Sequence, residues 1–207
     1  DMILSDGYTH RTYYMGLVDK NNKVNFYDGE VRVVDPEGKE FVKYAPRDYL
    51  NHVAEHVEPW TYVKFPFLKK VGWKGFVEGH DSGVYRVAPL ARLNVADGMQ
   101  TPPAQKHHDR MYDVLGGKPV HNTLAFHWAR LIESLQAAEK MVELLEDPGI
   151  TGTDLRNLPT RKPTEGVGIV EAPRGTLFHH FRVNRNDQVT MANVIVSTTN
   201  NKEPINR

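Results

Sequence analysis

The order of apolar and polar positions divides the chain into strand-like and helix-like regions. Over residues 1–45, short β-prone runs alternate with polar turns and predict a β-meander. Asp28-Gly29, between two of these runs, is a dipeptide typical of tight turns. The predicted strands are Tyr13–Val18, Val24–Tyr27, Val31–Val34 and Phe41–Tyr44.

Residues 46–147 predict a mixed and mainly helical core. Pro46 is suited to begin a helix over Asp48–Val57, since apolar residues recur there at three- and four-residue spacing. A second helix is expected over Ala104–Leu115, ended by Gly116-Gly117. The apolar face of the first helix would consist of Leu50, Val53, Ala54 and Val57.

The most regular apolar stripe lies between Thr123 and Glu146. Its four- and three-residue steps predict a long amphipathic helix that is buried in a helical bundle, with a two-stranded coiled coil as the alternative. Asp147-Pro148-Gly149 ends the helix, and residues 148–165 are expected to form a loop. The stripe consists of Leu124, Trp128, Leu131, Leu135, Ala138, Val142 and Leu145.

An aromatic-rich segment, Trp60–Trp73, shows neither period and is expected to be extended and mostly buried. Its rings could stack on bases, but no basic excess accompanies them, so packing in the core is the preferred interpretation. The aromatic residues concerned are Trp60, Tyr62, Phe65, Phe67 and Trp73.

Residues 166–200 predict a β-hairpin, which makes the expected fold α+β. Gly168–Glu171 with Thr176–Val183, and then Val189–Thr198, are strand-like and flank a polar turn. Ahead of the turn, Ala172-Pro173-Arg174-Gly175 interrupts the strand pattern. Proline fixes its own φ and glycine permits close backbone approach, so this corner suits an arginine that must hold one position. A solvated surface turn is the alternative.

Composition narrows the possible functions. The 207 residues carry 26 basic and 26 acidic side chains, which argues against nucleic acid and anionic membrane surfaces as partners. No apolar run has the length of a transmembrane helix, and no secretory signal is visible, so a cytoplasmic location is expected. The absence of cysteine excludes disulfides and thiolate ligation of a metal within this chain.

The histidines do not have the spacing of a metal site. Glu78, His80 and Asp81 are expected to lie in a solvated loop. His107-His108 and His179-His180 are adjacent pairs, and neighbours on a strand point to opposite faces. We therefore predict no metal ligand among them.

Five motifs resemble, in the same order, the large subunit of nickel–iron hydrogenases. The resemblance is closest to the soluble NAD-reducing and heterodisulfide-reductase-linked types and covers nearly the whole chain. Ala88 departs from it, because the family usually has glycine there. The motifs are YVKFPF (62–67), VYRVAPLARLNV (84–95), HWARLIESLQAAE (127–139), EAPRGTLFHH (171–180) and VTMANVIVSTTNN (189–201).

The resemblance implies a partial large-subunit fold and a parent enzyme that splits dihydrogen reversibly and heterolytically at a Ni–Fe centre. In that family four cysteine thiolates hold nickel, iron carries cyanide and carbon monoxide, and an iron–sulfur small subunit carries electrons away. Because cysteine is absent, residues 1–207 are expected to be a single internal fragment that binds no cofactor and is inactive alone. The alternative is a cysteine-free structural or interaction subunit.

The resemblance also implies which residues would surround the metal centre. Arg174 would lie over it and donate to a cyanide, while Ser197 and Thr198 would hydrogen-bond the second cyanide from the far strand of the hairpin. A main-chain carbonyl near Asn193 would help to bind magnesium in the parent enzyme. The dry walls around the diatomic ligands would be Pro173, Leu177 and Val196.

Overall fold

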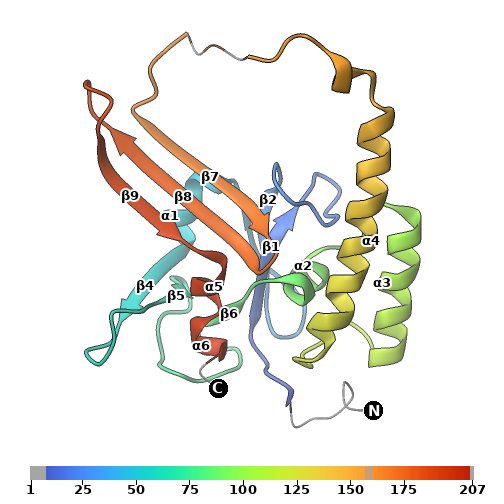
Figure 1. Ribbon diagram of the computed structural model, residues 1–207. Helices are drawn as coiled ribbons and strands as arrows, with labels where there is room; N and C mark the ends of the chain where they lie inside the picture. Colours follow the sequence, from blue (N-terminus) through green and yellow to red (C-terminus); the bar gives the residue numbers. More distant parts are fainter. Residues whose placement is uncertain (1–7, 157, 159, 206–207) are drawn as a thin grey trace.

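The computed structural model describes residues 8–156, 158 and 160–205, which form the α+β fold expected from the sequence (Figure 1). The strands are β1 (Tyr13–Val18), β2 (Glu30–Val34), β3 (Glu40–Tyr44), β4 (Val53–Val57), β5 (Lys64–Leu68), β6 (Tyr85–Arg86), β7 (Glu165–Ala172), β8 (Gly175–Val183) and β9 (Val189–Ile195). The α-helices are α1 (Tyr49–His52), α2 (Pro89–Val95), α3 (Pro102–Leu115), α4 (Ala125–Glu146), α5 (Ser197–Asn200) and α6 (Lys202–Ile205), with 3₁₀ turns η3 (Pro46–Asp48) and η4 (Pro148–Thr151).

The N-terminal strands form a sheet in the order β3-β2-β1-β6, in which β1 pairs antiparallel with β2 and parallel with β6. Three of the four predicted meander strands are present. The fourth, Val24–Tyr27, is wrong, because only isolated bridges form there. The Asn25 side chain accepts from the Tyr27 amide and donates to Asp28, and these local bonds hold the stretch as a turn.

Strand β1 is buried on both faces and separates two cores. Tyr14 and Val18 face the helical layer, whereas Tyr13 and Leu17 pack with the layer that contains β7–β9. At Gly16 a Cβ atom would lie 3.2 Å from the Arg92 Cα, so glycine lets α2 pack directly on the strand. The fold therefore has a helical layer, a central sheet and a C-terminal sheet.

The helical layer corrects the predicted stripe of α4. The helix packs on α2 and α3 mainly through Ala125, Ala129, Ile132 and the neighbouring polar residues. Of the predicted stripe, only Trp128 and Leu135 are partly buried against this core, within the described residues. Small alanines allow the close approach of two helices. α4 has 22 residues and α3 only 14, so the last turns of α4 extend past its neighbour (Figure 1). The exposed stripe residues include Leu131 at 71%, Val142 at 56% and Leu145 at 71%.

The predicted helix over Asp48–Val57 is also wrong beyond its first turn. β4 occupies its second half and pairs antiparallel with β5. β-Branched valines favour strands, and the complementary strand supplies cross-strand partners that a helix could not reach. The aromatic segment is only partly buried, since Phe65 is fully buried whereas Trp60 and Tyr62 are 65% and 100% exposed.

The C-terminal sheet has the order β7-β8-β9. It contains the expected hairpin and a second tight connection, the corner between β7 and β8. Strand β9 ends at Ile195, so the placement of Ser197 and Thr198 on a strand is wrong: both begin α5. Within the described residues, no helix combines the length and the apolar character needed to cross a membrane.

Candidate functional site

The corner between β7 and β8 is tightly packed against the start of α2. Gly175 has φ +123°, and a Cβ atom there would lie 2.1 Å from the Val87 Cγ2. Only glycine fits both the backbone conformation and the space. The Arg174 carbonyl accepts from Asn201 Nδ2 at 3.4 Å, and Asn201 Oδ1 accepts from the Val87 amide at 2.9 Å. Asn201 therefore ties the corner to the β6–α2 junction.

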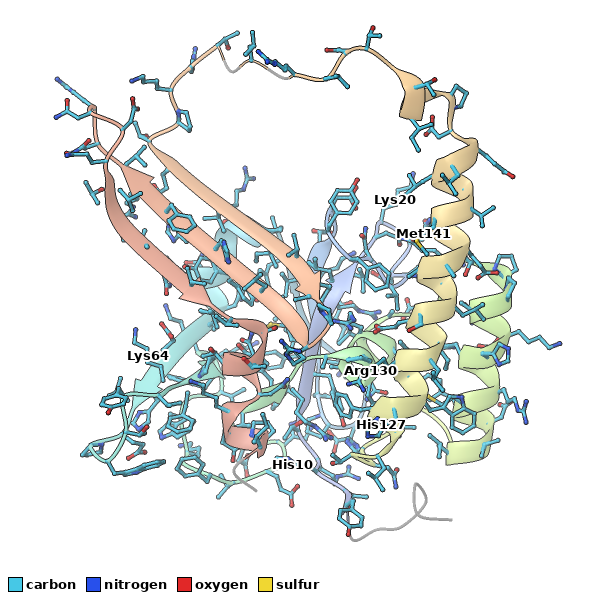
Figure 2. All side chains as sticks on the ribbon, viewed as in Figure 1. His10, Lys20, Lys64, His127, Arg130 and Met141 are labelled. Carbon is cyan, nitrogen blue, oxygen red and sulfur yellow. The ribbon has the colours of Figure 1, made fainter. Side chains whose placement is uncertain are left out.

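The Arg174 side chain lines a cavity of about 240 Å³ at this junction. Among the described residues, three arginines and no carboxylate contribute to its wall. Figure 2 shows one of them, Arg130, towards the N-terminal end of α4. The cavity, here called the arginine cavity, is lined by Arg86, Ala88, Thr123, Phe126, Arg130, Arg174, Thr198, Asn201, Pro204 and Ile205.

Arg86 is the buried member of this group, at 4% exposure. Its guanidinium donates to the His10 carbonyl, to Tyr14 Oη at 2.6 Å and to the His121 carbonyl at 3.2 Å. It also lies 5.1 Å from the Tyr14 ring centroid and 5.5 Å from that of Phe126. No ion pair joins it to a carboxylate of the described residues, so only neutral dipoles and rings stabilise its charge.

The neighbouring imidazole of His121 has a lowered pKa, and the charge of Arg86 contributes to it. Burial lowers the pKa of His121 to about 4, and repulsion from Arg11 and Arg86 adds to the effect. His121 Nδ1 lies 2.8 Å from Tyr14 Oη, and its Nε2 lies 2.9 Å from the Pro36 carbonyl. The imidazole is therefore neutral near pH 7 and does not repel the cation at its side.

Arg92, outside the cavity, is a second buried arginine. Unlike Arg86, it is paired with carboxylates. Its Nε and Nη2 donate to the two Glu133 oxygens at 2.5 and 2.7 Å, and Nη1 donates to Glu171 at 2.7 Å. Burial alone would lower the pKa of Arg92, but the two carboxylates raise it above its ordinary value. Burial raises the pKa of Glu171, and Arg92 offsets part of this rise.

Arg92 also holds the backbone that carries Arg174. Its Nη1 donates to the Ala172 carbonyl at 3.0 Å, directly before Pro173. Glu171 Oε1 accepts from the Leu17 amide and the Thr176 hydroxyl, both at 2.9 Å. The corner is thus fixed to β1, α2 and α4 by buried hydrogen bonds.

Some of the site residues expected from the sequence line the arginine cavity, and others do not. Arg174 and Thr198 line the arginine cavity, and Pro173 lines a neighbouring one of about 260 Å³ with Arg92. Ser197 is buried beside Thr198 on α5 but outside the cavity lining. Leu177 and Val196 also lie outside the lining of the arginine cavity. Leu177 is half-buried on β8, and Val196 is 43% exposed.

Asn193 lies in β9 opposite His180, and its side-chain amide donates to Tyr49 Oη at 2.9 Å. In the part of the chain that the structure describes, the one group of three histidine and carboxylate ligands lies elsewhere. The magnesium contact near Asn193 thus stays a prediction.

Besides Thr123, three polar residues of the cavity were assigned no role from the sequence. Arg86 and Arg130 belong to the VYRVAPLARLNV and HWARLIESLQAAE motifs, and Asn201 ends VTMANVIVSTTNN. The signal was present in these motifs, but only the fold brings them together.

Comparison with known proteins places this arrangement in a family. Residues 15–207 match the family described as nickel-dependent hydrogenase. The chain belongs to the nickel-dependent hydrogenase family. A relative from Archaeoglobus profundus, named as an iron-sulfur subunit of an F420-non-reducing hydrogenase, is 48% identical over 206 residues, which are 100% of this chain and 42% of the relative. The NAD-reducing hydrogenase HoxS subunit beta of Cupriavidus necator is 40% identical over 93% of this chain and 38% of its own length.

Solved hydrogenases have the same fold. An NAD+-reducing [NiFe]-hydrogenase in the H2-reduced state superposes with a TM-score of 0.88 at 39% identity, over 99% of this chain and 43% of that one. The [NiFeSe]-hydrogenase of Dm. baculatum has a TM-score of 0.61 at 19% identity over 93% of this chain and 42% of its own, and this likeness concerns the fold alone. The chain spans about two-fifths of the relatives it matches.

The residues present fit the surroundings of a Ni–Fe centre but not its ligand set. The chain has no cysteine, so it supplies no thiolate to nickel or iron. The polar groups of the arginine cavity are guanidinium, hydroxyl and amide groups, which donate hydrogen bonds to anions. Such a wall suits the anionic ligands of a metal centre held by other residues.

Proposed function

We propose that this chain is the part of a nickel–iron hydrogenase large subunit that surrounds the metal centre without ligating it. The observation that carries the proposal is the arginine cavity, whose wall contains three arginines and, among the described residues, no carboxylate. Arg86 is buried, and an anion in the cavity would offset the cost of burying its charge, while the exposed Arg130 and Arg174 add donors at the same wall. When bound, the Ni–Fe centre with its cyanide and carbon monoxide ligands supplies reversible heterolytic cleavage of dihydrogen.

The residues of this chain have separate tasks in that proposal. Arg174 donates to an anionic ligand, and the corner restricts its movement because Gly175 and Asn201 fix the backbone on either side. Thr198 offers a hydroxyl from the opposite wall. Arg92 is a positioning residue, since it bonds the Ala172 carbonyl and does not belong to the lining of the arginine cavity. Preorganised donors of this kind stabilise developing charge most effectively.

The remaining parts of the enzyme lie outside this chain in the proposal. The thiolate ligands come from other parts of the large subunit, and the electrons pass to an iron–sulfur small subunit. A magnesium ion near Asn193 belongs to the same assembly. The chain is therefore inactive by itself. The relatives are named as subunits, which supports a multisubunit parent.

A cysteine-free structural or interaction subunit is the second candidate. It would retain the fold, but it has no need for a cavity wall with three arginines and, among the described residues, no carboxylate. The exposed apolar end of α4 is compatible with both candidates, because either would have a further surface to cover it.

The test uses the complete natural protein with its partner subunits. Arg174→Lys is expected to lower hydrogen-dependent dye reduction about 10²–10³-fold while nickel and iron content stay unchanged, since the guanidinium fork is lost and the charge is kept. Arg185→Lys, in the exposed β8–β9 turn, is the matched control and should leave the rate unchanged.

Two outcomes would contradict the proposal. A wild-type rate in the metal-loaded Arg174→Lys enzyme would remove the catalytic role of Arg174. A complete wild-type protein with neither nickel nor hydrogen turnover would favour the structural role of the second candidate.

A further inference from the structure

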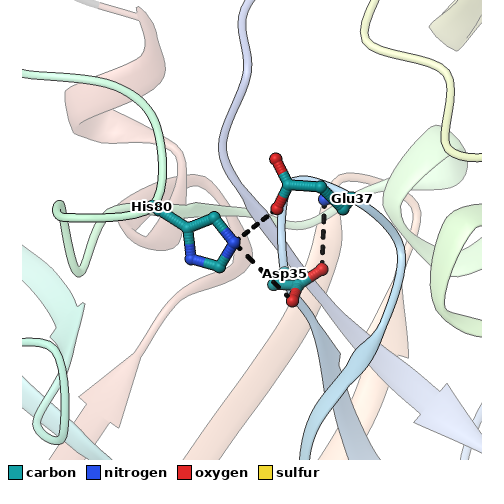
Figure 3. A group of neighbouring side chains, drawn as sticks. All are labelled: Asp35, Glu37 and His80. Carbon is teal, nitrogen blue, oxygen red and sulfur yellow. Dashed lines mark hydrogen bonds and ion pairs between the residues drawn. The ribbon is translucent and has the colours of Figure 1, made fainter.

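Two segments far apart in the sequence meet near the start of β1, away from the arginine cavity. The turn after β2 carries Asp35 and Glu37, and the loop before β6 carries His80 (Figure 3). His80 Nε2 lies 2.5 Å from Glu37 Oε2 and 3.8 Å from Asp35 Oδ2, and the three ligand atoms lie within 4.8 Å of one another. We infer that Asp35, Glu37 and His80 bind a divalent transition-metal cation such as Zn²⁺, which revises the prediction from sequence that His80 is not a metal ligand.

Asp35 is held with one oxygen aimed into this group. Its Oδ1 accepts from the Glu37 amide at 3.1 Å and the Lys39 amide at 2.9 Å. The residue is only 8% exposed. Within the described residues no hydrogen bond reaches Oδ2, which faces His80 beyond hydrogen-bond distance. This oxygen, which has no protein donor among the described residues, is available to a cation.

Tyr13 orients His80 from the other side. Its hydroxyl donates to the His80 carbonyl at 2.9 Å, so its single proton is already used. The same oxygen lies 3.4 Å from His80 Nδ1 and can only accept from it. A neutral imidazole with Nδ1–H has its lone pair on Nε2, towards the two carboxylates. Histidines that bind metals are oriented in this way by a partner of the other ring nitrogen.

The donor set determines the kind of ion. One imidazole and two carboxylates, without thiolate, suit Zn²⁺ or Mn²⁺ and leave further positions for water. Arg11 Nη2 bonds Glu37 Oε1 at 3.2 Å, which leaves Oε2 for the metal. Glu37 and His80 are both about half exposed, so the ion can enter from solvent. The inference does not depend on the hydrogenase proposal, because none of these residues lines the arginine cavity.

The experiment is a calorimetric titration of the chelator-treated chain with Zn²⁺, repeated with Co²⁺ and visible absorption as a report of geometry. We expect one site per chain. His80→Gln and Glu37→Gln should each lower the affinity at least tenfold, since each removes a ligand. Tyr13→Phe should lower it about 10–100-fold while all three ligands remain, as is typical when a partner of a metal-binding histidine is lost.

His56→Gln is the matched control. His56 Nε2 lies 2.9 Å from Glu58 Oε1, so it has one carboxylate partner but, among the described residues, no second one. This variant should bind Zn²⁺ as the wild type does. Circular dichroism in the presence of chelator checks that each variant is folded, and His80→Gln and Glu37→Gln are mild changes because these side chains are 56% and 51% exposed.

The inference is overturned if folded His80→Gln and Glu37→Gln bind Zn²⁺ as tightly as the wild type, or if His56→Gln loses the site instead. The three residues would then be an ion pair that joins the turn to the loop.

Discussion

Two buried arginines on either side of Ala88 have opposite surroundings. Arg92 is 2% exposed and is paired with Glu133 and Glu171, whereas Arg86 is 4% exposed and, among the described residues, contacts neutral acceptors and aromatic rings. The pair of carboxylates makes Arg92 a structural cross-link between α2, α4 and β7. Arg86 lies beside a cavity that is lined by two further arginines. Burial does not distinguish the two residues, but the presence of a counter-ion does.

The largest effect is expected from removing the neutralised arginine. Arg92→Met leaves two buried carboxylates without their cation, so the free energy of unfolding should fall by about 3–5 kcal/mol. Urea unfolding of the chain measures it. Arg110→Met, on the exposed side of α3, is the control and should change stability by less than about 0.5 kcal/mol.

Arg86→Met should cost less, about 1–3 kcal/mol, because it leaves unsatisfied carbonyls but no unpaired charge. The same urea titration applies. If Arg86→Met were as damaging as Arg92→Met, the distinction between the two arginines would not hold.

Ala88, between them, should give a gain in stability. It has φ 90° and ψ −176°, a region that is essentially limited to glycine and costs about 1–3 kcal/mol for other residues. Glycine loses more conformational entropy on folding than alanine, and this offsets about 0.5–1 kcal/mol of the relieved strain. We therefore expect Ala88→Gly to raise the unfolding free energy by about 1 kcal/mol, measured by thermal unfolding. Ala91→Gly, inside α2, is the control and should lower it.

Arg174→Lys should change the stability of this chain by less than about 1 kcal/mol, because the side chain is exposed and no ion pair joins it to a described carboxylate. Thermal unfolding of the variant measures it. A loss comparable to that of Arg92→Met would make Arg174 a structural residue like Arg92.

The last prediction concerns the dependence of stability on pH. The pKa of His121 in the folded chain is about 4, below its ordinary value of 6.5. The unfolded chain therefore binds more protons between these values, and stability falls as pH falls through this window. His121→Asn should flatten the dependence of the urea midpoint on pH between about 6.5 and 4. An unchanged slope would show that burial does not lower the pKa of His121 in the folded chain.

The sequence predicted those elements whose pattern is local. The α+β class, strand β1, helix α3 and the C-terminal hairpin follow from apolar period and turn residues. Predictions failed where a segment distant in the sequence determines the secondary structure or the buried face. Val53–Val57 pairs with Lys64–Leu68, and α4 buries alanines because α2 and α3 approach that face. The leucine stripe of α4 is regular, but periodicity alone does not show which face has a neighbour.

The candidate site was predictable in part. The Pro173–Gly175 corner indicated a fixed Arg174, and the motifs indicated the family before the fold was known. The convergence of Arg86, Arg130 and Arg174 was not predictable from spacing, because β6, α4 and the corner are brought together only by the two cores. The approach of His80 to Asp35 depends in the same way on tertiary structure.

The hydrogen bond from the Leu17 amide to Glu171 has a consequence for synthesis of the chain on the ribosome. The two residues are 154 positions apart, and Leu17 lies in the strand on which both cores are built. At about 5–20 residues per second, about 8–30 s pass between the synthesis of Leu17 and that of Glu171. During that interval the C-terminal strands, which cover part of β1, are still absent. We therefore expect the nascent N-terminal half to expose apolar surface of β1 until translation has passed β7 and β8.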